Sequence, residues 1–487
     1  MKTFLISFIL SLTAFAQTNQ KFEDYFVDET LRIDYFHIGD AKTEMITIDK
    51  MFRYGIWAGS QYHLIDNFNN GKYYLKIYDY NSGKLIYSKG FDTFFGEYAS
   101  GDDGINGVTK SFHETAVIPF PKSKIAFALE KRNDKNELEE FFRTLVDPNS
   151  IYIIKDKIAD ETVEIFKPVN NGDPHTKVDI VILAEGYKKS EKEKFQKDLN
   201  RFVGYFFEQE PYKSQKNNFN IYGVFKPSEE SGTDLPGADI FVNTILNTTF
   251  WSLGSERYLM TEDNLSMRNL AAHVPYDAIY IQVNHPRYGG GGIYNQYCTY
   301  TTDNQFAKYL FTHEFGHSFT GLADEYYTSD VAYNDFFKPT VEPVEPNITA
   351  LMDKKNIKWK KYLSAGIEIP TPWEKEEFDK FSYEWMKERN RLNSYVAELI
   401  RNRAPENEIK AAEEEYAMKD KKQSEKVDKY LMSSKYWNKV GAFEGAGYQP
   451  KGIYRPMLDC IMFSKGNKPF CKVCEEAIKE VIESYTQ

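Results

Sequence analysis

Residues 312–326 read THEFGHSFTGLADEY, and this stretch decides how the rest of the chain is interpreted. His313 and His317 are separated by four positions, and four residues advance an α-helix by about 400°. Their imidazoles therefore lie one turn apart on one face, where both can bind a single zinc ion. Glu314 lies between them in sequence and can reach a reacting water without binding the metal itself. This H-E-x-x-H arrangement is that of zinc peptidases.

The residues around the two histidines fit a helix that is docked on a protein core. Phe311, Phe315 and Phe319 repeat at every fourth position and can pack on one side, and Gly316 permits another element to approach closely. The alternative is a surface helix with two ordinary histidines. With 8 His in 487 residues, a chance match is on the order of one in a hundred chains. The pattern therefore favours a metal site.

A catalytic zinc ion needs a third protein ligand and an open fourth position. Gly321 is placed to end the helix and reverse the chain, so that an acidic side chain returns to the metal. Related sites place Gly three and the ligand six residues after the second His. Here Gly is four and Asp seven residues after it, so one extra residue must be absorbed. Asp324 is favoured, while Glu325 and a remote Glu stay open.

The segment that precedes the motif alternates strands with a helix. Residues 178–183 form a near-continuous apolar run, typical of a strand buried on both faces. A helical stripe follows over residues 195–206, and further strands are expected at 220–225 and 278–283. This order predicts an α/β layer. The polar connection 227–234 is either an ordered loop at the rim of the active site or an ordinary surface loop.

The N-terminal part, residues 17–165, is expected to be all β. Seven short runs rich in Tyr, Ile, Val and Phe are separated by turn residues, which suggests an antiparallel sandwich without catalytic residues. The runs are 43–48, 73–80, 85–88, 115–120, 124–129, 151–155 and 163–166. The domain boundary is therefore placed near residue 165.

Residues 1–16 resemble a signal peptide. A basic Lys2 precedes a short apolar run, and Ala14-Phe15-Ala16 forms a small-x-small cleavage site. The chain is therefore expected to be exported to the periplasm or the exterior. No later stretch approaches 18 apolar residues, so no transmembrane segment is expected. The net charge of −11 argues against a nucleic-acid-binding protein, because such proteins present a positively charged surface to the phosphates.

Residues 373–435 read as a helical hairpin inserted in the catalytic domain. Gly is absent between Gly366 and Gly441, and an apolar stripe is followed by a second, charged helix from about residue 406 to 430. The charged residues of this hairpin suit a surface that is exposed to solvent. A more specific alternative is that the hairpin controls access of substrate to the active site.

The four cysteines are Cys298, Cys460, Cys471 and Cys474. In an exported chain, a structural disulfide near residue 460 is favoured over metal or redox chemistry.

Several motifs together resemble the IgA-peptidase family of secreted bacterial zinc metallopeptidases. The resemblance covers roughly residues 165–370 and 440–480, and the N-terminal sandwich also resembles the domain that accompanies this family. It rests on His313 to His317 with Gly321-Leu322-x-Asp324-Glu325-Tyr326, the strand and turn 178–187, the loop 227–234, Asn284 with Tyr288-Gly289-Gly290, Glu444 to Tyr448, Gly452-x-Tyr454-Arg455-Pro456 and Cys460-x-Met462.

The resemblance implies a metzincin-like catalytic fold in which His313, His317 and Asp324 bind Zn2+. It also implies that Met462 forms a Met-turn beneath the ligands, although ordinary core packing is the alternative. Tyr454 is a candidate donor to the developing oxyanion, and a purely structural tyrosine is the alternative. The expected fold class is thus α+β and multi-domain, with the metallopeptidase domain over residues 166–487.

The expected function is a secreted zinc endopeptidase that cleaves proteins or glycoproteins, with Glu314 as general base. Two alternatives are kept. One is a non-catalytic surface protein that binds glycan or protein and holds a structural zinc ion. The other is a peptidase of cell-wall peptides or glycopeptides. The sequence gives no signal for the substrate or for the oligomeric state.

Overall fold

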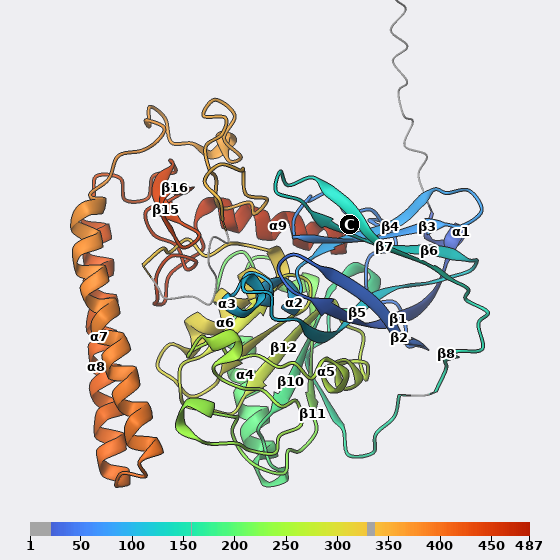
Figure 1. Cartoon of the computed structure of the whole chain (residues 1–487), viewed down its shortest axis with the longest axis horizontal. Helices are drawn as coiled ribbons and strands as arrows, with labels where there is room; N and C mark the ends of the chain where they lie inside the picture. The colour runs from blue at the N-terminus through green and yellow to red at the C-terminus, as the bar shows by residue number, and fades with distance from the viewer. Residues whose placement is uncertain (1–20, 157, 329–336) are drawn as a thin grey trace, which may run out of the picture.

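The computed structural model describes residues 21–156, 158–328 and 337–487 (Figure 1). The predicted signal peptide, residues 1–16, lies outside the described residues. Among the helices that are described, none combines the length and the apolar character needed to cross a membrane.

The first part of the chain forms two four-stranded sheets that enclose one hydrophobic core. Antiparallel pairing dominates both sheets; only the short β8 is parallel to its neighbour. One sheet has the order β5-β1-β2-β8 and the other β4-β3-β6-β7, and apolar side chains of both meet in the core. The elements are α1 (Phe22–Tyr25), β1 (Phe26–Gly39), β2 (Glu44–Tyr54), β3 (Tyr73–Asp79), β4 (Leu85–Phe91), α2 (Phe94–Tyr98), α3 (Asp102–Ile105), β5 (Lys110–Pro121), β6 (Ile125–Arg132), β7 (Leu138–Val146) and β8 (Ile153–Ile154).

Two of these strands, β1 and β7, were not among the expected runs. Conversely, the run 163–166 does not belong to this part. It begins β9 (Glu164–Val169), which pairs antiparallel with β11 (Phe219–Phe225) in the next sheet. The assignment of that run to the N-terminal sheets was wrong, because short β-rich runs carry no information about their partner strand.

A six-stranded sheet with the order β13-β14-β12-β10-β11-β9 forms the centre of the second part. Its central strand β10 (Val178–Glu185) is buried along its whole length and parallel to both neighbours. The other strands are β12 (Ala278–Val283), β14 (Tyr297–Thr301) and the antiparallel edge strand β13 (Gly290–Ile293). A strand covered on both faces needs apolar side chains on both, which explains the continuous run in the sequence.

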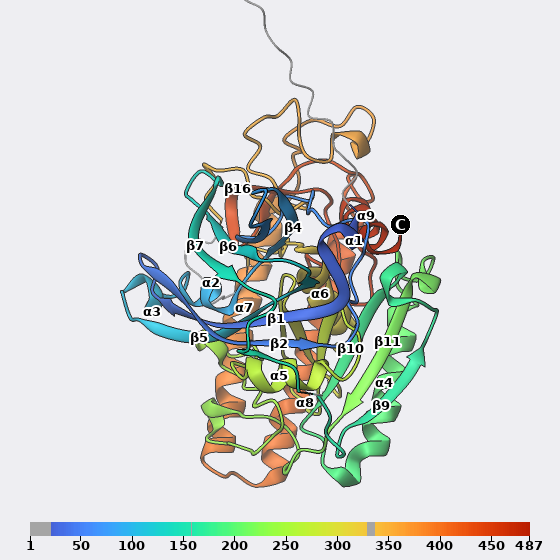
Figure 2. The ribbon, with the colours of Figure 1, turned by 90° about the vertical axis from the view of Figure 1, so that its right-hand side faces the viewer.

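Helices cover both faces of this sheet. Helices α4 (Lys192–Phe206) and α6 (Ala307–Thr320) share one core with one face, together with α9 (Lys472–Thr486). On the other face, α5 (Asn264–Ala271) packs with aromatic residues of α2, so the two parts of the chain meet here. Figure 2 shows α4 beside β11 and β9. The two-stranded sheet β15 (Phe443–Ala446) and β16 (Gln449–Arg455) follows the inserted helices.

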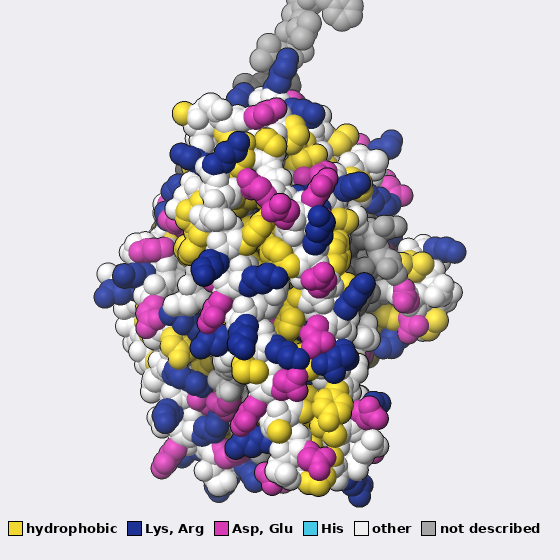
Figure 3. All heavy atoms as spheres, turned by 90° about the vertical axis from the view of Figure 1, so that its left-hand side faces the viewer, with side chains coloured by type: hydrophobic (Ala, Val, Ile, Leu, Met, Phe, Trp, Pro, Cys, Tyr) yellow, Lys and Arg dark blue, Asp and Glu magenta, His cyan; other side chains and the backbone are white. Residues whose placement is uncertain are grey.

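The inserted segment forms two antiparallel helices, α7 (Lys375–Arg401) and α8 (Glu406–Met432). They form a long rod along one edge of the molecule (Figure 1). Phe378, Val427 and Leu431 at the base of the rod enter the core of the second part. Figure 3 views the molecule from the rod's side, where Lys and Arg side chains are interspersed with Asp and Glu, as expected of a solvated surface.

Candidate metal centre

Helix α6 carries both histidines and is anchored by aromatic stacking on the side away from them. Phe311 and Phe315 stack on Tyr280 of β12, at centroid distances of 4.5 and 4.9 Å, and Phe319 stacks on Phe315 at 4.8 Å. The expected docking of these phenylalanines is therefore confirmed. Because the helix is fixed by its aromatic face, its histidine face has a defined orientation.

The two histidines and Asp324 converge on one point. His313 Nε2 lies 3.0 Å and His317 Nε2 3.3 Å from Asp324 Oδ1, and the two Nε2 atoms are 3.1 Å apart. A tetrahedral zinc ion with bonds of about 2.0–2.1 Å holds its ligand atoms about 3.3 Å from one another. Asp324 Oδ1 is buried and accepts no hydrogen bond. The three donors thus fit a metal ion, as the residues alone suggested.

The outer nitrogens of both imidazoles bond to backbone carbonyls. His313 Nδ1 lies 2.9 Å from the carbonyl oxygen of Ile461, and His317 Nδ1 lies 2.6 Å from that of Leu322. A carbonyl only accepts, so each Nδ1 carries a hydrogen, and in the neutral imidazole each Nε2 presents its lone pair to the shared point. Tyr448 donates its hydroxyl to Asp324 Oδ2, which orients the carboxylate that is expected to be the third ligand.

The segment after the helix turns sharply to bring Asp324 back. Gly321 ends α6 with φ 66°, the left-handed region that favours glycine. Asn347, which is fully buried, both accepts from the backbone N–H of Ala323 and donates to its carbonyl, each at 2.8 Å. Asn347 thus braces residues 321–326, named here the ligand loop because Asp324 is the expected third ligand. No local sequence pattern pointed to this role of Asn347.

The ligand loop also rests on the segment around Met462. The backbone N–H of Glu325 donates to the carbonyl of Met462 at 2.8 Å. A methyl group added at Gly316 would lie 2.9 Å from Met462 Sδ, so this glycine does allow the close approach that was expected. Met462 itself is fully buried. The sulfur therefore packs directly under the helix that carries the ligands.

Glu314 is buried next to the three donors, in a cavity of about 260 Å³. Burial raises the pKa of its carboxyl, and the neighbouring His313 and His317 oppose that rise. Burial lowers the pKa of His317, but the adjacent Asp324 carboxylate outweighs it and raises that pKa to about 9. The site therefore favours positive charge at the point where the three donors meet, as a cation site must.

Comparison with known protein families establishes the family to which this chain belongs. The family profile described as IgA Peptidase M64 matches residues 166–482. The chain belongs to the IgA Peptidase M64 family. The profile described as Peptidase M64 N-terminus matches residues 21–143, so the M64 N-terminal domain precedes the peptidase domain. A search of curated proteins finds no match. Membership identifies the chain as a metallopeptidase with mixed α/β, multi-domain architecture.

In this M64 peptidase, the inserted rod forms one wall of the cavity that holds Glu314 and the three converging side chains, referred to below as the catalytic cavity because catalysis is expected there. Trp385, Met386 and Arg389 of α7 line it, as do Gln423 and Ser424 of α8. On α8, Asp420 forms a 2.9 Å ion pair with Lys465, which also lines the cavity. The family motifs give no hint of this wall, because it comes from residues about 70 to 110 positions beyond the histidines.

The M64 N-terminal domain also reaches the catalytic helix. Asn70 Nδ2 donates to the carbonyls of Thr320 and Gly321, at 2.9 and 3.3 Å. These are carbonyls at the end of α6 that no residue within the helix can satisfy. The N-terminal domain, in which no chemistry was expected, therefore caps the helix that carries His313 and His317.

Two candidate site residues, Tyr454 and Glu325, lie away from the two histidines, and the expected disulfide is not formed. Tyr454 lies on β16, where its backbone pairs with Thr349 at 2.8 and 3.0 Å, and it is not among the residues that line the cavity. Glu325 points away from the histidines, toward the cysteines. The expected disulfide is absent from this structure: all four cysteines are free thiols. The Cys460 and Cys474 sulfurs are 3.9 Å apart, well beyond the ~2.0 Å of a disulfide bond.

Proposed function

We propose that this chain is an exported zinc endopeptidase in which His313, His317 and Asp324 hold the ion. The observation that carries the proposal is the placement of Glu314 in the same cavity as three converging donor atoms. The donor set of two imidazoles and one carboxylate suits zinc. Export rests on the signal-peptide pattern of residues 1–16. A β-sandwich and a metzincin-like fold remain predictions from the family resemblance.

Zinc, when bound, supplies a Lewis acid that polarises the scissile carbonyl and acidifies water. Glu314 then acts as general base: its carboxylate takes a proton from the attacking water and passes it to the leaving amine. Burial raises the pKa of the Glu314 carboxyl, which makes its carboxylate a stronger base for the proton of the attacking water. The backbone carbonyls on both Nδ1 atoms keep the imidazoles oriented throughout.

Tyr326 is better placed than Tyr454 to assist at the carbonyl oxygen. Its side chain lines the cavity, and its ring lies parallel to that of His313, with the centroids 6.4 Å apart. Arg257 donates to the Tyr326 hydroxyl at 3.1 Å, which leaves the phenolic hydrogen to be donated to substrate. A hydrogen bond from a phenol to a developing oxyanion stabilises the transition state.

An extended polypeptide is the substrate that the surroundings favour. A second hollow of about 1590 Å³ lies between the rod, the peptidase domain and the part of the N-terminal domain around α2 and α3. Arg257, Tyr288 and Arg389 line both this hollow and the catalytic cavity, so the two adjoin. Trp251 and Phe250 supply apolar surface in the hollow. Continuous space on this scale suits several residues of a peptide on one side of the cut bond.

The decisive experiment compares wild type with Glu314→Gln on a proteome-derived peptide library, with metal content measured alongside. The amide cannot accept the proton, so we expect cleavage to fall about 100-fold or more while zinc stays bound. Glu193→Gln, an exposed carboxyl on α4, is the matched control and should cleave normally. If wild type binds zinc but cuts no peptide or protein, the non-catalytic binding function is favoured instead.

A further inference from the structure

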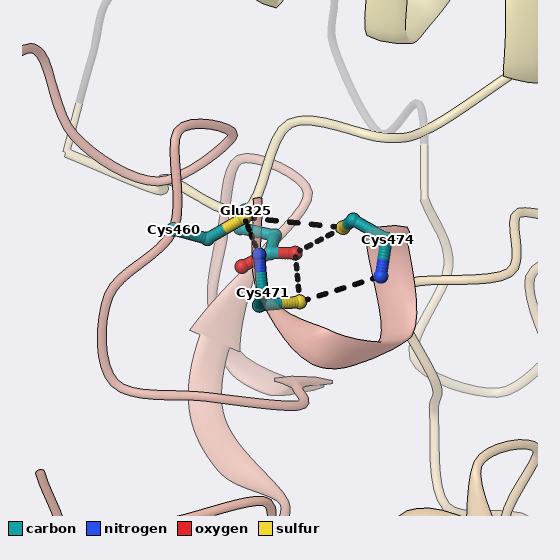
Figure 4. Close-up of side chains that lie close together, drawn as sticks. All are labelled: Glu325, Cys460, Cys471 and Cys474. Atoms are coloured by element: carbon teal, nitrogen blue, oxygen red, sulfur yellow. Dashed lines mark hydrogen bonds between the residues drawn. The ribbon is translucent and has the colours of Figure 1, made fainter. Parts of the chain in front are cut away.

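Behind the ligand loop, Glu325 and three cysteines form a second cluster of metal-binding side chains. Figure 4 shows Glu325, Cys460, Cys471 and Cys474 pointing toward one another from three separate segments. Their ligand atoms all lie within 4.8 Å of one another, and the four side chains are almost wholly buried. Glu325 and Cys460 stand within the family motifs, but the proposed mechanism gives none of the four side chains a role.

The spacing of the four atoms is that of a tetrahedral site. With bonds of about 2.3 Å to sulfur and 2.0 Å to oxygen, a tetrahedral zinc ion separates two sulfurs by about 3.8 Å and a sulfur from an oxygen by about 3.5 Å. Cys460 Sγ and Cys474 Sγ are 3.9 Å apart. Glu325 Oε1 lies 3.8 Å from Cys471 Sγ and 3.2 Å from Cys474 Sγ. These separations need only small shifts to accept an ion.

The hydrogen bonds around the cluster also suit thiolates. The backbone N–H of Cys471 donates to Cys460 Sγ at 3.1 Å, and that of Cys474 donates to Cys471 Sγ at 3.5 Å. Cys471 and Cys474 stand at the start of α9, where backbone N–H groups are unpaired and favour negative charge. Hydrogen bonds of this kind are a regular feature of metal–thiolate sites.

The Glu325 carboxylate is the second, independent sign of a missing cation. Its side chain is 0% exposed. Asn347 donates to Oε1 at 3.1 Å, but Oε2 has no hydrogen-bond partner. A buried carboxylate is costly unless it is paired with a cation or binds a metal. A disulfide between two of the cysteines would leave Oε2 of this carboxylate without a bonded partner, since the nearby buried Arg455 attracts the carboxylate but donates to backbone carbonyls instead.

We propose that Glu325, Cys460, Cys471 and Cys474 bind a second zinc ion as a structural site. All four ligands come from the protein, so no position stays open for water, which distinguishes structural from catalytic zinc. The ion binds thiolates, so its uptake releases the protons of the three thiols and no electron is transferred. The site does not depend on the chemistry proposed for Glu314.

The cluster of Glu325 and the three cysteines is joined to the histidine site by short stretches of chain. Cys460 is followed by Ile461 and Met462, whose carbonyls accept from His313 Nδ1 and from the Glu325 N–H. Glu325 itself follows Asp324. An ion held by Cys460 and Glu325 therefore fixes both the segment beneath the histidines and the loop that supplies the third ligand.

The test is metal analysis of the purified full chain, prepared without chelator or reductant. Wild type should hold two zinc ions per chain, and His313→Ala/His317→Ala should keep one. Cys471→Ser/Cys474→Ser should lose one zinc, whereas Cys298→Ser, a buried cysteine outside the cluster, should keep both. A wild-type protein with one zinc that disappears in the histidine variant would overturn the proposal, as would a cysteine variant that still holds two.

A second measurement needs only wild type, in case the double cysteine variant does not fold. Denatured in the presence of a chelator without reductant, the chain should show four reactive thiols per molecule; two thiols would mean a disulfide and would refute the site. Exchange of zinc for Co2+ should also give intense near-ultraviolet thiolate-to-cobalt absorption. That absorption should persist in His313→Ala/His317→Ala, and its absence would count against cysteine ligation.

Discussion

Asp324 and Glu325 are adjacent in the chain, yet their carboxylates face two different clusters. Asp324 Oδ1 lies 3.0 Å from His313 Nε2, whereas Glu325 Oε1 lies 3.2 Å from Cys474 Sγ. Because one peptide unit joins them, a shift of either carboxylate is transmitted to the other. Of the two local candidates for the third catalytic ligand, this arrangement favours Asp324 and gives Glu325 a different role.

The first prediction ranks the contributions to zinc binding at the histidine site. Asp324→Asn removes the negative ligand, and Tyr448→Phe removes only the hydrogen bond to Asp324 Oδ2. Loss of such an outer partner typically weakens metal binding about 10- to 100-fold, so Tyr448→Phe should be intermediate between wild type and Asp324→Asn. Competition with a zinc-binding dye measures the order. The exposed Tyr80→Phe should match wild type, and an Asp324→Asn protein of unchanged affinity would exclude Asp324 as ligand.

The second prediction concerns Asn347. Its replacement by Ala leaves the N–H and carbonyl of Ala323 unpaired in a buried place, which should lower the free energy of unfolding by roughly 2–4 kcal/mol. Zinc affinity should fall as well, because the ligand loop loses its brace. Denaturant unfolding and zinc competition test both. Asn356→Ala, exposed and bonded to Asp353, is the control; equal stability of the two variants would argue against the brace.

The third prediction tests the rod as a wall of the catalytic cavity. Trp385→Ala removes a large side chain from the cavity lining, so contacts with substrate are lost while the metal ligands are untouched. We expect kcat/KM on long peptides to fall about 10-fold, the scale of roughly 1.4 kcal/mol in lost binding, with zinc content unchanged. Tyr395→Ala, an exposed residue of the same helix, should have no effect. Identical kinetics for both variants would remove the rod from substrate binding.

The fourth prediction is a pH dependence of stability far from either cluster. The Asp277 carboxylate accepts the backbone N–H of Asp179 at 2.8 Å, and the backbone N–H of Asp277 donates to the Asp179 carbonyl at 2.7 Å. Burial raises the pKa of both carboxyls, and for Asp179 the nearby Asp277 raises it further. Between about pH 4, where an unfolded Asp titrates, and these raised pKa values, the folded state binds more protons than the unfolded chain. Stability must therefore fall as the pH rises through that window.

Asp277→Asn removes one of the two carboxyls whose ionisation destabilises the folded state. The amide oxygen of the new side chain can still accept the Asp179 N–H. The variant should be more stable than wild type at pH 8, by on the order of 1 kcal/mol, and the gain should shrink toward pH 5. Thermal unfolding at several pH values measures it. Asp24→Asn, an exposed carboxyl in α1, serves as control. A gain that is the same at pH 5 and pH 8 would contradict the account.

The local parts of the site could be predicted from the sequence because they depend on helix geometry. His313, Glu314 and His317 are fixed relative to one another by the 3.6-residue period, and the Gly321 turn brings Asp324 back within seven residues of His317. Asn347 and Tyr448 could not be found in this way. They are 24 and 124 positions from their partners, and no spacing rule connects such positions.

The strand β1 was missed for a different physical reason. Arg32 and Asp34 interrupt its apolar pattern, and charged residues normally indicate a surface. In the structure both are 0% exposed and form a two-pronged ion pair at 2.6 and 2.7 Å. A buried charge that is paired within its own strand looks like an exposed charge in the sequence. The expectation of a disulfide among the cysteines failed for a similar reason. Glu325, which completes the proposed metal site with three of them, lies 135 positions before Cys460, and no local pattern connects the two.

The bond between His313 Nδ1 and the Ile461 carbonyl joins residues that are 148 positions apart. Translation makes His313 first, and it must leave the ribosome long before its partner exists. Until residue 461 has emerged, the carbonyl that accepts from Nδ1 is missing, and the Tyr309 hydroxyl, 3.2 Å from the same nitrogen, is the partner already made. We therefore expect nascent chains to be inert, so that the producing cell is not exposed to proteolysis by an unfinished enzyme.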